Sequence, residues 1–258
     1  MSLQGHTALV TGASRGLGKA IALRLARDGA AVCVNYVARG SDAEAVVEEI
    51  RSAGGRGVAI RADIGEPGQA RSLIERTAAE LGPVSILVNN AGVAYRATIE
   101  DFDSAGMERM RRTNVDGLIR LTQAAVPSMK ERRFGRVVNI TSIAGHGTTL
   151  PGSTFYAATK AAVSLLTRRF AMELGAHGIT VNAVAPGFIL TDMVKDGRSE
   201  EEYARVVQKV SERAMVGRVG QPEDIARAVA FLVAPEAGFI TAQVLTVDGG
   251  RMDYIGHP

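Results

Sequence analysis

Short apolar segments alternate with longer helical patterns along nearly the whole of this 258-residue chain. Several of the apolar segments lack polar alternation, which is typical of strands that are covered on both faces. The strand candidates are residues 7–11, 31–36, 58–62, 84–89, 136–141, 179–185 and 243–247. Helical patterns separate them at about residues 16–28, 42–53, 67–81, 104–132, 153–174 and 222–233. The alternation predicts an α/β protein with a single-domain, Rossmann-like, doubly wound sheet of seven parallel strands and helices on both faces.

Composition agrees with an ordinary globular protein. Hydrophobic residues make up 46% of the chain and charged residues 22%. No apolar run approaches the roughly 20 residues that span a bilayer, and residues 1–6 lack a signal-peptide core. We therefore expect a cytoplasmic protein without a membrane partner. The single cysteine, Cys33, has no disulfide partner and lies in an apolar run, which predicts an inert core residue.

The net charge of +3 raises the question of nucleic-acid binding, because arginines cluster at three places in the chain. A modest excess without interleaved aromatic residues or a recognisable binding module is a weak electrostatic footprint. We expect no nucleic-acid partner and no metal site. An anionic cofactor or substrate carrier is a better use for some of these cations.

A glycine-rich turn follows the first strand candidate. Residues 11–18 read Thr-Gly-Ala-Ser-Arg-Gly-Leu-Gly and lead directly into a helical run. Gly12, Gly16 and Gly18 remove side chains where a pyrophosphate must approach backbone N–H groups at a helix N-terminus. A glycine turn alone is also common at ordinary helix caps. Its position between a strand and a helix favours nucleotide binding.

Two further motifs carry candidate chemistry. The strand candidate at residues 84–89 runs into Asn90, Ala91 and Gly92, and amides at such a strand end can bond a loop and a ligand together. Further along, Tyr156 and Lys160 are four residues apart, so that a helix places them on one face. A nearby ammonium can stabilise a phenolate. In isolation this pair would read as an incidental feature of an amphipathic helix.

Taken in order, residues 11–18, residues 89–92, Ser142 and residues 156–160 resemble the short-chain dehydrogenase/reductase family, and the resemblance extends from Thr7 to Gly250. It implies an oxidoreductase in which Tyr156 exchanges the proton and Ser142 bonds the carbonyl oxygen. Lys160 would bind the nicotinamide ribose and stabilise the phenolate, and Asn114 would hold a water that relays protons to this lysine. The cofactor-binding residues that it implies are Gly12, Ser14, Arg15, Gly16, Leu17, Gly18, Asn35, Arg39, Asp63, Ile64, Asn90, Ala91, Gly92, Tyr156, Lys160, Pro186, Gly187, Ile189 and Thr191.

The second strand candidate bears on the choice of cofactor. An acidic residue near the end of that strand would accept hydrogen bonds from the ribose 2′-hydroxyl of NAD, and we assign this place to Asn35. An amide does not repel a 2′-phosphate, and Arg15 and Arg39 are cations that can pair with it. NADP is therefore the favoured cofactor, with NAD as the alternative.

The substrate is open at this point. The chain resembles bacterial 3-oxoacyl-acyl-carrier-protein reductases, which implies a thioester on an acyl carrier protein, and Arg133 matches a basic position of those enzymes. Residues 153–155, Ser-Thr-Phe, and His177 depart from that subgroup. A dehydrogenase of another small alcohol or sugar is one alternative. A non-catalytic NADP-binding sensor or scaffold is another, although such proteins typically lose the tyrosine or lysine that this chain retains.

Two expectations concern the end of the chain. The irregular stretch that follows the sixth strand candidate predicts a substrate lid over about residues 186–213. The helix candidate at 153–174 carries more small and apolar surface than one sheet face needs, and the last strand leaves an open edge. In the family these two elements form the interfaces of a homotetramer, which we expect here. The tail 251–258 can reach a neighbouring subunit or fray.

Overall fold

The predicted strands form one sheet in a computed structural model of the chain, which describes residues 2–148, 151–191 and 199–251. The strand order is β3-β2-β1-β4-β5-β6-β7, and each neighbouring pair is parallel. The order reverses between β1 and β4, which is where doubly wound folds bind ligands. The strands are β1 Thr7–Val10, β2 Ala31–Tyr36, β3 Arg56–Arg61, β4 Val84–Asn89, β5 Gly135–Ile140, β6 Ile179–Pro186 and β7 Val244–Val247.

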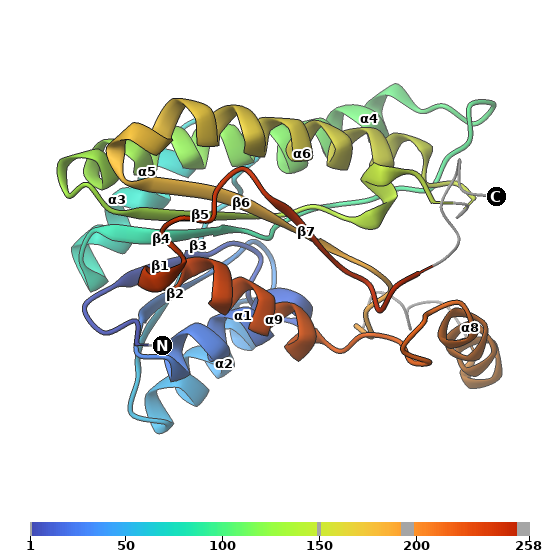
Figure 1. Cartoon of the computed structure of the whole chain (residues 1–258), viewed down its shortest axis with the longest axis horizontal. Helices are drawn as coiled ribbons and strands as arrows, with labels where there is room; N and C mark the ends of the chain where they lie inside the picture. The colour runs from blue at the N-terminus through green and yellow to red at the C-terminus, as the bar shows by residue number, and fades with distance from the viewer. Residues whose placement is uncertain (1, 149–150, 192–198, 252–258) are drawn as a thin grey trace.

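Helices cover both faces of the sheet (Figure 1). One face carries α1 (Gly16–Arg27), α2 (Gly40–Ser52) and α9 (Pro222–Val233). The other carries α3 (Gln69–Leu81), α5 (Leu118–Glu131) and α6 (Thr154–Leu174). The doubly wound fold predicted from the sequence is thus confirmed.

Each face of the sheet has its own apolar core. Along β1, Ala8 and Val10 point into the core beneath α1, α2 and α9, whereas Leu9 points into the core beneath α3, α5 and α6. Cys33 lies in the second core, and burial raises its pKa to about 12. A thiol that is buried and protonated is chemically inert, as the sequence predicted. Strands buried on both faces explain why the sequence shows continuous apolar runs there.

The predicted helix at residues 104–132 is not one regular helix. It consists of α4 (Ser104–Arg111), a π-helical turn η1 (Arg112–Gly117) and α5. Asp103 caps α4 by accepting hydrogen bonds from the N–H groups of Ala105 and Gly106. A π-turn inserts an extra residue into the helix, which changes the direction of nearby side chains and is frequent at functional sites. Asn114 lies in this turn.

The helix α8 (Glu200–Glu212) differs from the others. It has a capping box formed by Ser199 and Glu202, yet none of its residues is buried. Figure 1 shows it apart from both helical layers, near the loops that leave the sheet. Among the described residues, no helix combines the length and apolar character that crossing a bilayer requires. Three short helices not predicted from sequence are η2 (Ile143–His146), η3 (Gly175–His177) and η4 (Pro235–Ala237).

Candidate active site

The Tyr156–Lys160 pair lies on the first turns of α6, with Ser142 just beyond the end of β5. The Lys160 Nζ is 5.7 Å from the centre of the Tyr156 ring. Helical spacing puts both side chains on the same face, as the sequence predicted. The two elements that carry the three residues are adjacent, because η2 and α6 pack directly together.

Lys160 is an almost fully buried ammonium, 4% exposed. Its Nζ donates a hydrogen bond to the carbonyl oxygen of Ile140 at 2.8 Å. Desolvation lowers the pKa of this amine to about 8. A charge of this kind is costly to bury unless it is paired. Lys160 is therefore poised to change its charge close to neutral pH, which suits a group that interacts with a titrating neighbour.

Tyr156 is half-buried, and burial raises the pKa of its phenol, while a side-chain hydrogen bond with Ser142 acts in the opposite direction. The phenol is thus held in its protonated form. Ser142 is fixed by its own backbone geometry, because it caps η2 and its Oγ accepts a hydrogen bond from the N–H of Ala144 at 3.1 Å. The pair presents two hydroxyl groups side by side, which is the arrangement needed to donate to a developing oxyanion.

Asn114 is fixed by three hydrogen bonds from its side chain. Its Oδ1 accepts from the N–H of Val93 at 2.8 Å, and its Nδ2 donates to the carbonyl oxygen of Val93 at 2.8 Å and to Thr159 Oγ1 at 3.1 Å. The Thr159 hydroxyl donates onward to the carbonyl oxygen of Tyr156 at 2.8 Å. The π-turn, the loop after β4 and the start of α6 are thereby joined. Sequence analysis missed Thr159, although it lies inside the 156–160 motif.

Gly92 is the place where these groups meet. A methyl group added at its Cα would lie 3.4 Å from Asn114 Oδ1 and 3.5 Å from Lys160 Nζ. The Asn90-Ala91-Gly92 turn therefore runs directly past the lysine. Of the four predicted catalytic residues, the structure brings Ser142, Tyr156 and Lys160 together and ties Asn114 behind them.

Three positions of the glycine-rich turn favour glycine, two through their backbone conformation and one through packing. Gly12 and Gly16 have positive φ angles of 61° and 55°. A Cβ on Gly18 would lie 2.3 Å from the Gly12 carbonyl oxygen and 2.7 Å from Asn90 Nδ2. Glycine at position 18 is thus required by packing, which places the start of α1 directly against the turn.

Asn90 and Thr11 lock this turn to the loop after β4. Asn90 Nδ2 donates to the carbonyl oxygens of Thr11 at 2.7 Å and Gly12 at 3.2 Å. In return, Thr11 Oγ1 accepts from the N–H groups of Asn90 and Ala91, each at 3.0 Å. The Asn90 amide therefore shapes the glycine-rich turn, and its Nδ2 is committed to protein groups.

The start of α1 fits an anion. Its N-cap is Arg15, which makes no side-chain cap, and its first turn contains no acidic residue. Backbone N–H groups at such a helix end attract phosphate through their own donors and the helix dipole. Gly16 and Leu17, at this end of the helix, and Ser14 just before it are placed where the sequence predicted a pyrophosphate. The residues present thus fit a dinucleotide, on the evidence of backbone geometry.

Asn35 requires a correction. It is 1% exposed, and its Nδ2 donates to the carbonyl oxygens of Ile60 at 3.2 Å and Ala62 at 3.0 Å, while its Oδ1 accepts from the Gly12 N–H at 3.3 Å. The expectation that this amide faces a 2′-phosphate is wrong, because its hydrogen-bonding groups hold β2, β3 and the glycine turn together. The partly exposed residue at the end of β2 is Tyr36.

The two predicted phosphate-binding cations lie at helix starts. Arg15 precedes α1 and Arg39 precedes α2. Arg39 forms a 3.3 Å ion pair with Asp42, and both side chains are about half exposed, at 54% and 45%. An exposed pair of this kind is weak. Arg39 can therefore exchange this carboxylate for a phosphate at little cost.

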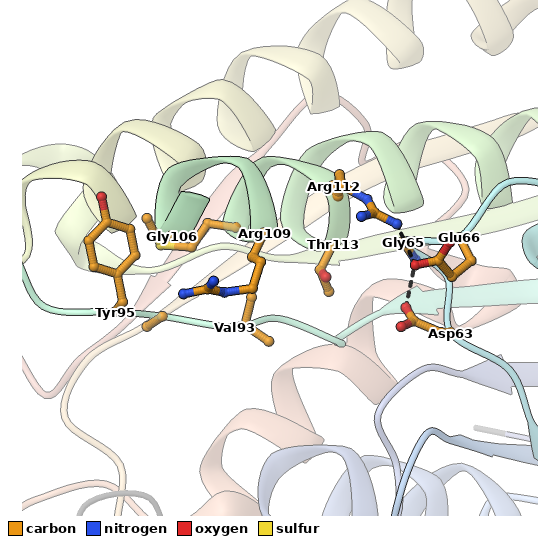
Figure 2. A pocket seen from close by; sticks show the side chains of 11 residues that line it. Asp63, Gly65, Glu66, Val93, Tyr95, Gly106, Arg109, Arg112 and Thr113 are labelled. Atoms are coloured by element: carbon orange, nitrogen blue, oxygen red, sulfur yellow. Dashed lines mark hydrogen bonds and ion pairs between the residues drawn. The ribbon is translucent and has the colours of Figure 1, made fainter. Parts of the chain in front are cut away.

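Asp63 and Ile64 follow β3, and Asp63 lines a cavity of about 400 Å³ (Figure 2). Asp63 Oδ1 accepts a hydrogen bond from the Gly65 N–H at 2.9 Å, whereas Ile64 is buried. Figure 2 shows the cavity extending from Asp63 along α4 to Tyr95, with the Arg112–Glu66 ion pair at the Asp63 end. It contains none of the catalytic candidates.

The remaining predicted cofactor residues follow β6. Pro186 ends this strand, and the Gly187 N–H donates to the Val247 carbonyl oxygen at 2.9 Å. A Cβ on Gly187 would lie 2.6 Å from the Asp248 Cβ, so the backbones touch here. Further on, Thr191 lies beside the glycine turn, since a Cβ on Gly16 would be 3.6 Å from the Thr191 Cγ2. Residues 192–198 of the predicted lid lie outside the described residues.

Comparison with known proteins places this geometry in a family. Residues 12–251 match a family model described as enoyl-(acyl carrier protein) reductase. The 3-oxoacyl-[acyl-carrier-protein] reductase FabG of Staphylococcus aureus is 41% identical over 244 residues, covering 95% of this chain and 97% of that protein.

Solved structures of similar proteins support the same family assignment. A 7α-hydroxysteroid dehydrogenase complexed with NADH and 7-oxo glycochenodeoxycholic acid superposes with a TM-score of 0.91 at 38% identity, covering 99% of this chain and 97% of that one. A blue fluorescent protein from a metagenomic library, in complex with NADPH, has a TM-score of 0.88 at 39% identity and covers 97% and 99%. The chain belongs to the short-chain dehydrogenase/reductase family of oxidoreductases.

Proposed function

We propose that this protein is an NADP-preferring oxidoreductase that interconverts a carbonyl group and a secondary alcohol, with a 3-oxoacyl thioester on an acyl carrier protein as the first candidate substrate. The observation that supports this most is the grouping of Ser142, Tyr156 and Lys160 beside Gly92. This grouping has a proton donor, an oxyanion-binding hydroxyl and a buried cation in one place.

In reduction, Tyr156 gives its phenolic proton to the carbonyl oxygen, and Ser142 donates a hydrogen bond to the same oxygen. The nicotinamide supplies the hydride when it is bound, and accepts it in the reverse direction. Burial keeps the pKa of Tyr156 high, so the phenol is protonated at neutral pH. Lys160, four residues away, stabilises the phenolate that remains and contacts the nicotinamide ribose.

Asn114 positions the loop that passes the lysine. Because its side chain is bonded to Val93 and Thr159, it fixes Gly92 and the start of α6 relative to each other. A proton-relay water that reaches Lys160 is held, in this proposal, at the backbone of the π-turn, where regular helical bonding is interrupted.

The preference for NADP rests on Arg15, in the glycine turn before α1, and Arg39, which lies between β2 and α2. Arg39 is available to a 2′-phosphate, since its ion pair with Asp42 is exposed. In this region the residue at the end of β2 is Tyr36, which carries no negative charge. NAD remains the alternative cofactor, and the solved relatives include a complex with each nucleotide.

The candidate substrate is supported by similarity to the staphylococcal 3-oxoacyl-[acyl-carrier-protein] reductase. A second candidate, another secondary alcohol such as a hydroxysteroid or sugar, is supported by the 7α-hydroxysteroid dehydrogenase. We place the substrate lid at about residues 186–213, because α8 lies within it and buries none of its own residues. A non-catalytic nucleotide-binding role is the third candidate.

We also propose that the protein is a homotetramer. Leu165 and Met172 on the outer face of α6 are 59% and 64% exposed, which leaves an apolar surface without a partner in one chain. At the edge strand β7, Leu245 is 37% exposed, and the neighbouring Phe239 is fully exposed. Multi-angle light scattering at micromolar concentration should give a tetrameric mass, and a monomeric mass contradicts this assembly.

The function is tested by following NADPH and NADH oxidation with a fixed panel: acetoacetyl-CoA, crotonyl-CoA, a 7-oxo bile acid, a diketone and a keto sugar. We expect acetoacetyl-CoA to be reduced fastest and NADPH to be preferred. Faster reduction of crotonyl-CoA would instead indicate enoyl reduction, in line with the description of the matched family model. Equal background rates for wild type and Tyr156→Phe on every compound would leave only the non-catalytic role.

A further inference from the structure

The turn that follows β7, residues 248–251, touches two segments that the proposed reaction must keep aligned. On one side the Gly187 N–H is bonded to the Val247 carbonyl oxygen, and Gly187 has no space for a Cβ because of Asp248. The loop at 186–190 carries the expected cofactor residues Pro186, Gly187 and Ile189, and in the proposed function it holds the nicotinamide, so we call it the nicotinamide loop. It rests directly against the beginning of this turn. The contact is between backbones, so it leaves little freedom for either segment to shift alone.

On its other side the turn pairs with the segment that leaves α8. The N–H groups of Met215 and Val216 donate to the carbonyl oxygens of Gly250 and Gly249, each at 3.2 Å. Ala214 and Arg251 form an antiparallel bridge next to these bonds. Residues 214–220, which follow α8 and which we call the lid exit, are thus attached to the turn at 248–251 by a short ladder.

Two adjacent glycines make this ladder possible. Gly249 and Gly250 have φ angles of 70° and 71°, a left-handed conformation that residues with a Cβ rarely adopt. A Cβ on Gly249 would lie 2.8 Å from Val216 Cγ2, and one on Gly250 would lie 2.9 Å from Met215 Sδ. The side chains of the lid exit therefore lie directly on the two glycines.

The far end of the lid exit returns to the nicotinamide loop. The Gly220 N–H donates to the Phe188 carbonyl oxygen at 3.0 Å, and the Leu190 N–H donates to the Gly220 carbonyl oxygen at 2.9 Å. A Cβ on Gly220 would lie 2.4 Å from the Ile189 Cδ1. Residues 214–220 are consequently held between the turn at 248–251 and the loop at 186–190.

We propose that Gly249 and Gly250 are positioning residues for the reaction: they set the place of the lid helix α8 relative to the nicotinamide loop, and through it the affinity for the carbonyl substrate. This inference rests on the proposed function for its kinetic part only. The helix α8 itself buries none of its residues, so the ladder at its exit is a backbone anchor that does not depend on core packing of the helix.

The test uses the full-length protein and the substitution Gly249→Ala, with acetoacetyl-CoA or the best substrate of the panel as the probe. Because the added methyl group pushes Val216 away, the lid exit moves, and we expect KM to rise about tenfold with a smaller change in kcat, since misplacements near 1 Å can have large kinetic effects. Affinity for NADPH, measured by fluorescence titration without substrate, should change less than KM does.

Gly54→Ala is the matched control. Gly54 has a φ of 82° and nothing within 4 Å of its hypothetical Cβ, so this variant introduces the same backbone strain without the steric overlap. We expect it to lower Tm as Gly249→Ala does while leaving KM unchanged. If Gly249→Ala also leaves KM unchanged, the proposal is overturned, and the turn at 248–251 contributes to stability only.

Rescue separates positioning from general damage. Val216→Ala removes the atom that the new Cβ meets, so the double variant Gly249→Ala/Val216→Ala should recover most of the KM defect relative to Val216→Ala alone. A defect that persists in the double variant contradicts the proposed route.

Hydrogen exchange provides a readout that does not depend on the reaction. The amides of Met215 and Val216 should exchange faster in Gly249→Ala and not in Gly54→Ala, because the ladder is opened. Unchanged exchange at both amides overturns the positioning role even if the protein proves inactive on every carbonyl compound. Faster exchange in a protein that reduces none of the carbonyl compounds would contradict the proposed function, but it would support the role of Gly249 in holding the ladder.

Discussion

The cofactor side and the substrate side of this site are built differently. On the cofactor side, Asn90 and Thr11 lock the glycine turn by four hydrogen bonds, and Gly18 tolerates no added atom. On the substrate side, α8 buries no residue, and its exit, where Met215 and Val216 are 74% and 61% exposed, is held by a short backbone ladder rather than by core packing. In the proposed function, the nucleotide is thus held by a close-packed frame, whereas the substrate meets a helix none of whose residues is buried.

The largest expected effect is on the chemical step itself, which depends on neither the cofactor side nor the substrate side alone. Tyr156→Phe removes the proton donor and should lower kcat by about 10²–10⁴-fold, the range of general acid catalysis. Affinity for NADPH should stay nearly the same, because the cofactor frame is intact. Tyr95→Phe is the control, since it removes a hydroxyl that donates to the Asp103 carbonyl oxygen. Retained turnover in Tyr156→Phe would show that another group supplies the proton.

Gly18→Ala tests the rigidity of the cofactor side. The methyl group has no space between Gly12, Ala13 and Asn90. The turn must therefore open, and we expect nucleotide affinity to fall by up to about 10²-fold, the equivalent of the 1–3 kcal/mol typical of overpacking. Isothermal titration with NADPH measures this change.

Gly175→Ala is the control for that experiment, because Gly175 has a helical φ of −56° and nothing within 4 Å of its hypothetical Cβ. If Gly18→Ala binds NADPH with the affinity of the wild type, the glycine turn adapts to an added methyl group more easily than its contacts indicate. The cofactor side and the lid would then not differ in rigidity.

Cofactor preference offers a finer test. Arg15→Ala/Arg39→Ala should reduce the preference for NADPH over NADH by about tenfold or more, because charge-assisted bonds to a phosphate are lost. Asn35→Asp should instead weaken both nucleotides alike, since a carboxylate cannot donate to Ile60 and Ala62. Both expectations are checked by the ratio of kcat/KM with NADPH to kcat/KM with NADH, which should fall in the double arginine variant and stay unchanged in Asn35→Asp. A wild type that already prefers NADH would refute the pairing argument.

The pH dependence follows from Lys160. Its pKa is lowered to about 8, so its positive charge is lost as the pH rises through that value. We expect kcat/KM for reduction, and affinity for NADPH, to fall severalfold between pH 8 and pH 9, because the lysine then contributes no charge. Lys160→Arg, which stays charged, should be slower but should lack this decrease. A flat wild-type profile would place the pKa of Lys160 well above 8.

The same group affects stability with a definite sign. The unfolded chain holds the Lys160 proton up to its usual pKa of 10.5, whereas the folded protein releases it near 8. Between these values the unfolded state binds more protons, so the free energy of unfolding rises with pH. Relative to Lys160→Met, the wild type should gain stability from about pH 8 to 10.5 in urea titrations. A constant difference would contradict the burial argument.

The smallest effects compare the caps of two helices. Ser199 caps α8 through its side chain, and at α9 the Asp224 carboxylate accepts from the Gln221 N–H at 2.9 Å, but α9 buries half of its twelve residues and α8 none. Asp224→Ala should lower the global free energy of unfolding by about 1 kcal/mol, the usual value of a cap. Ser199→Ala should leave Tm unchanged and only speed amide exchange in α8. A comparable loss of Tm in both variants would show that α8 is integrated into the core.

Sequence patterns were sufficient for the frame. Apolar runs identified the seven strands of the sheet; the central strands are buried on both faces and need continuous apolar residues, whereas the edge strands β3 and β7 are partly exposed. The motifs likewise identified the glycine turn at 11–18, the loop after β4 that it bonds, and the grouping of Ser142, Tyr156 and Lys160. These features are local, in that spacing along the chain determines them.

Other features depend on long-range contacts and had no local signal. The burial of Asn35 follows from carbonyl groups on β3, which lie about 25 residues away. The π-turn at 112–117 depends on Val93, and the lysine's partner is the backbone of Ile140. The ladder between 214–216 and 249–251 joins segments that only the folded sheet brings together.

The parallel bridge between Ile189 and Gly220 closes the base of the substrate side. Among the described residues between these two positions, the segment at 214–216 makes a second attachment, through its ladder with residues 249–251, so that the excursion is held to the frame near its C-terminal end. The entropy of closing such an excursion grows slowly, by about 0.6 kcal/mol for each doubling of its length. In the proposed function, an exchange confined to α8 would therefore alter the alcohol that is accepted, while the bridge at 189 and 220, the ladder at 214–216 and Thr191 stay in place.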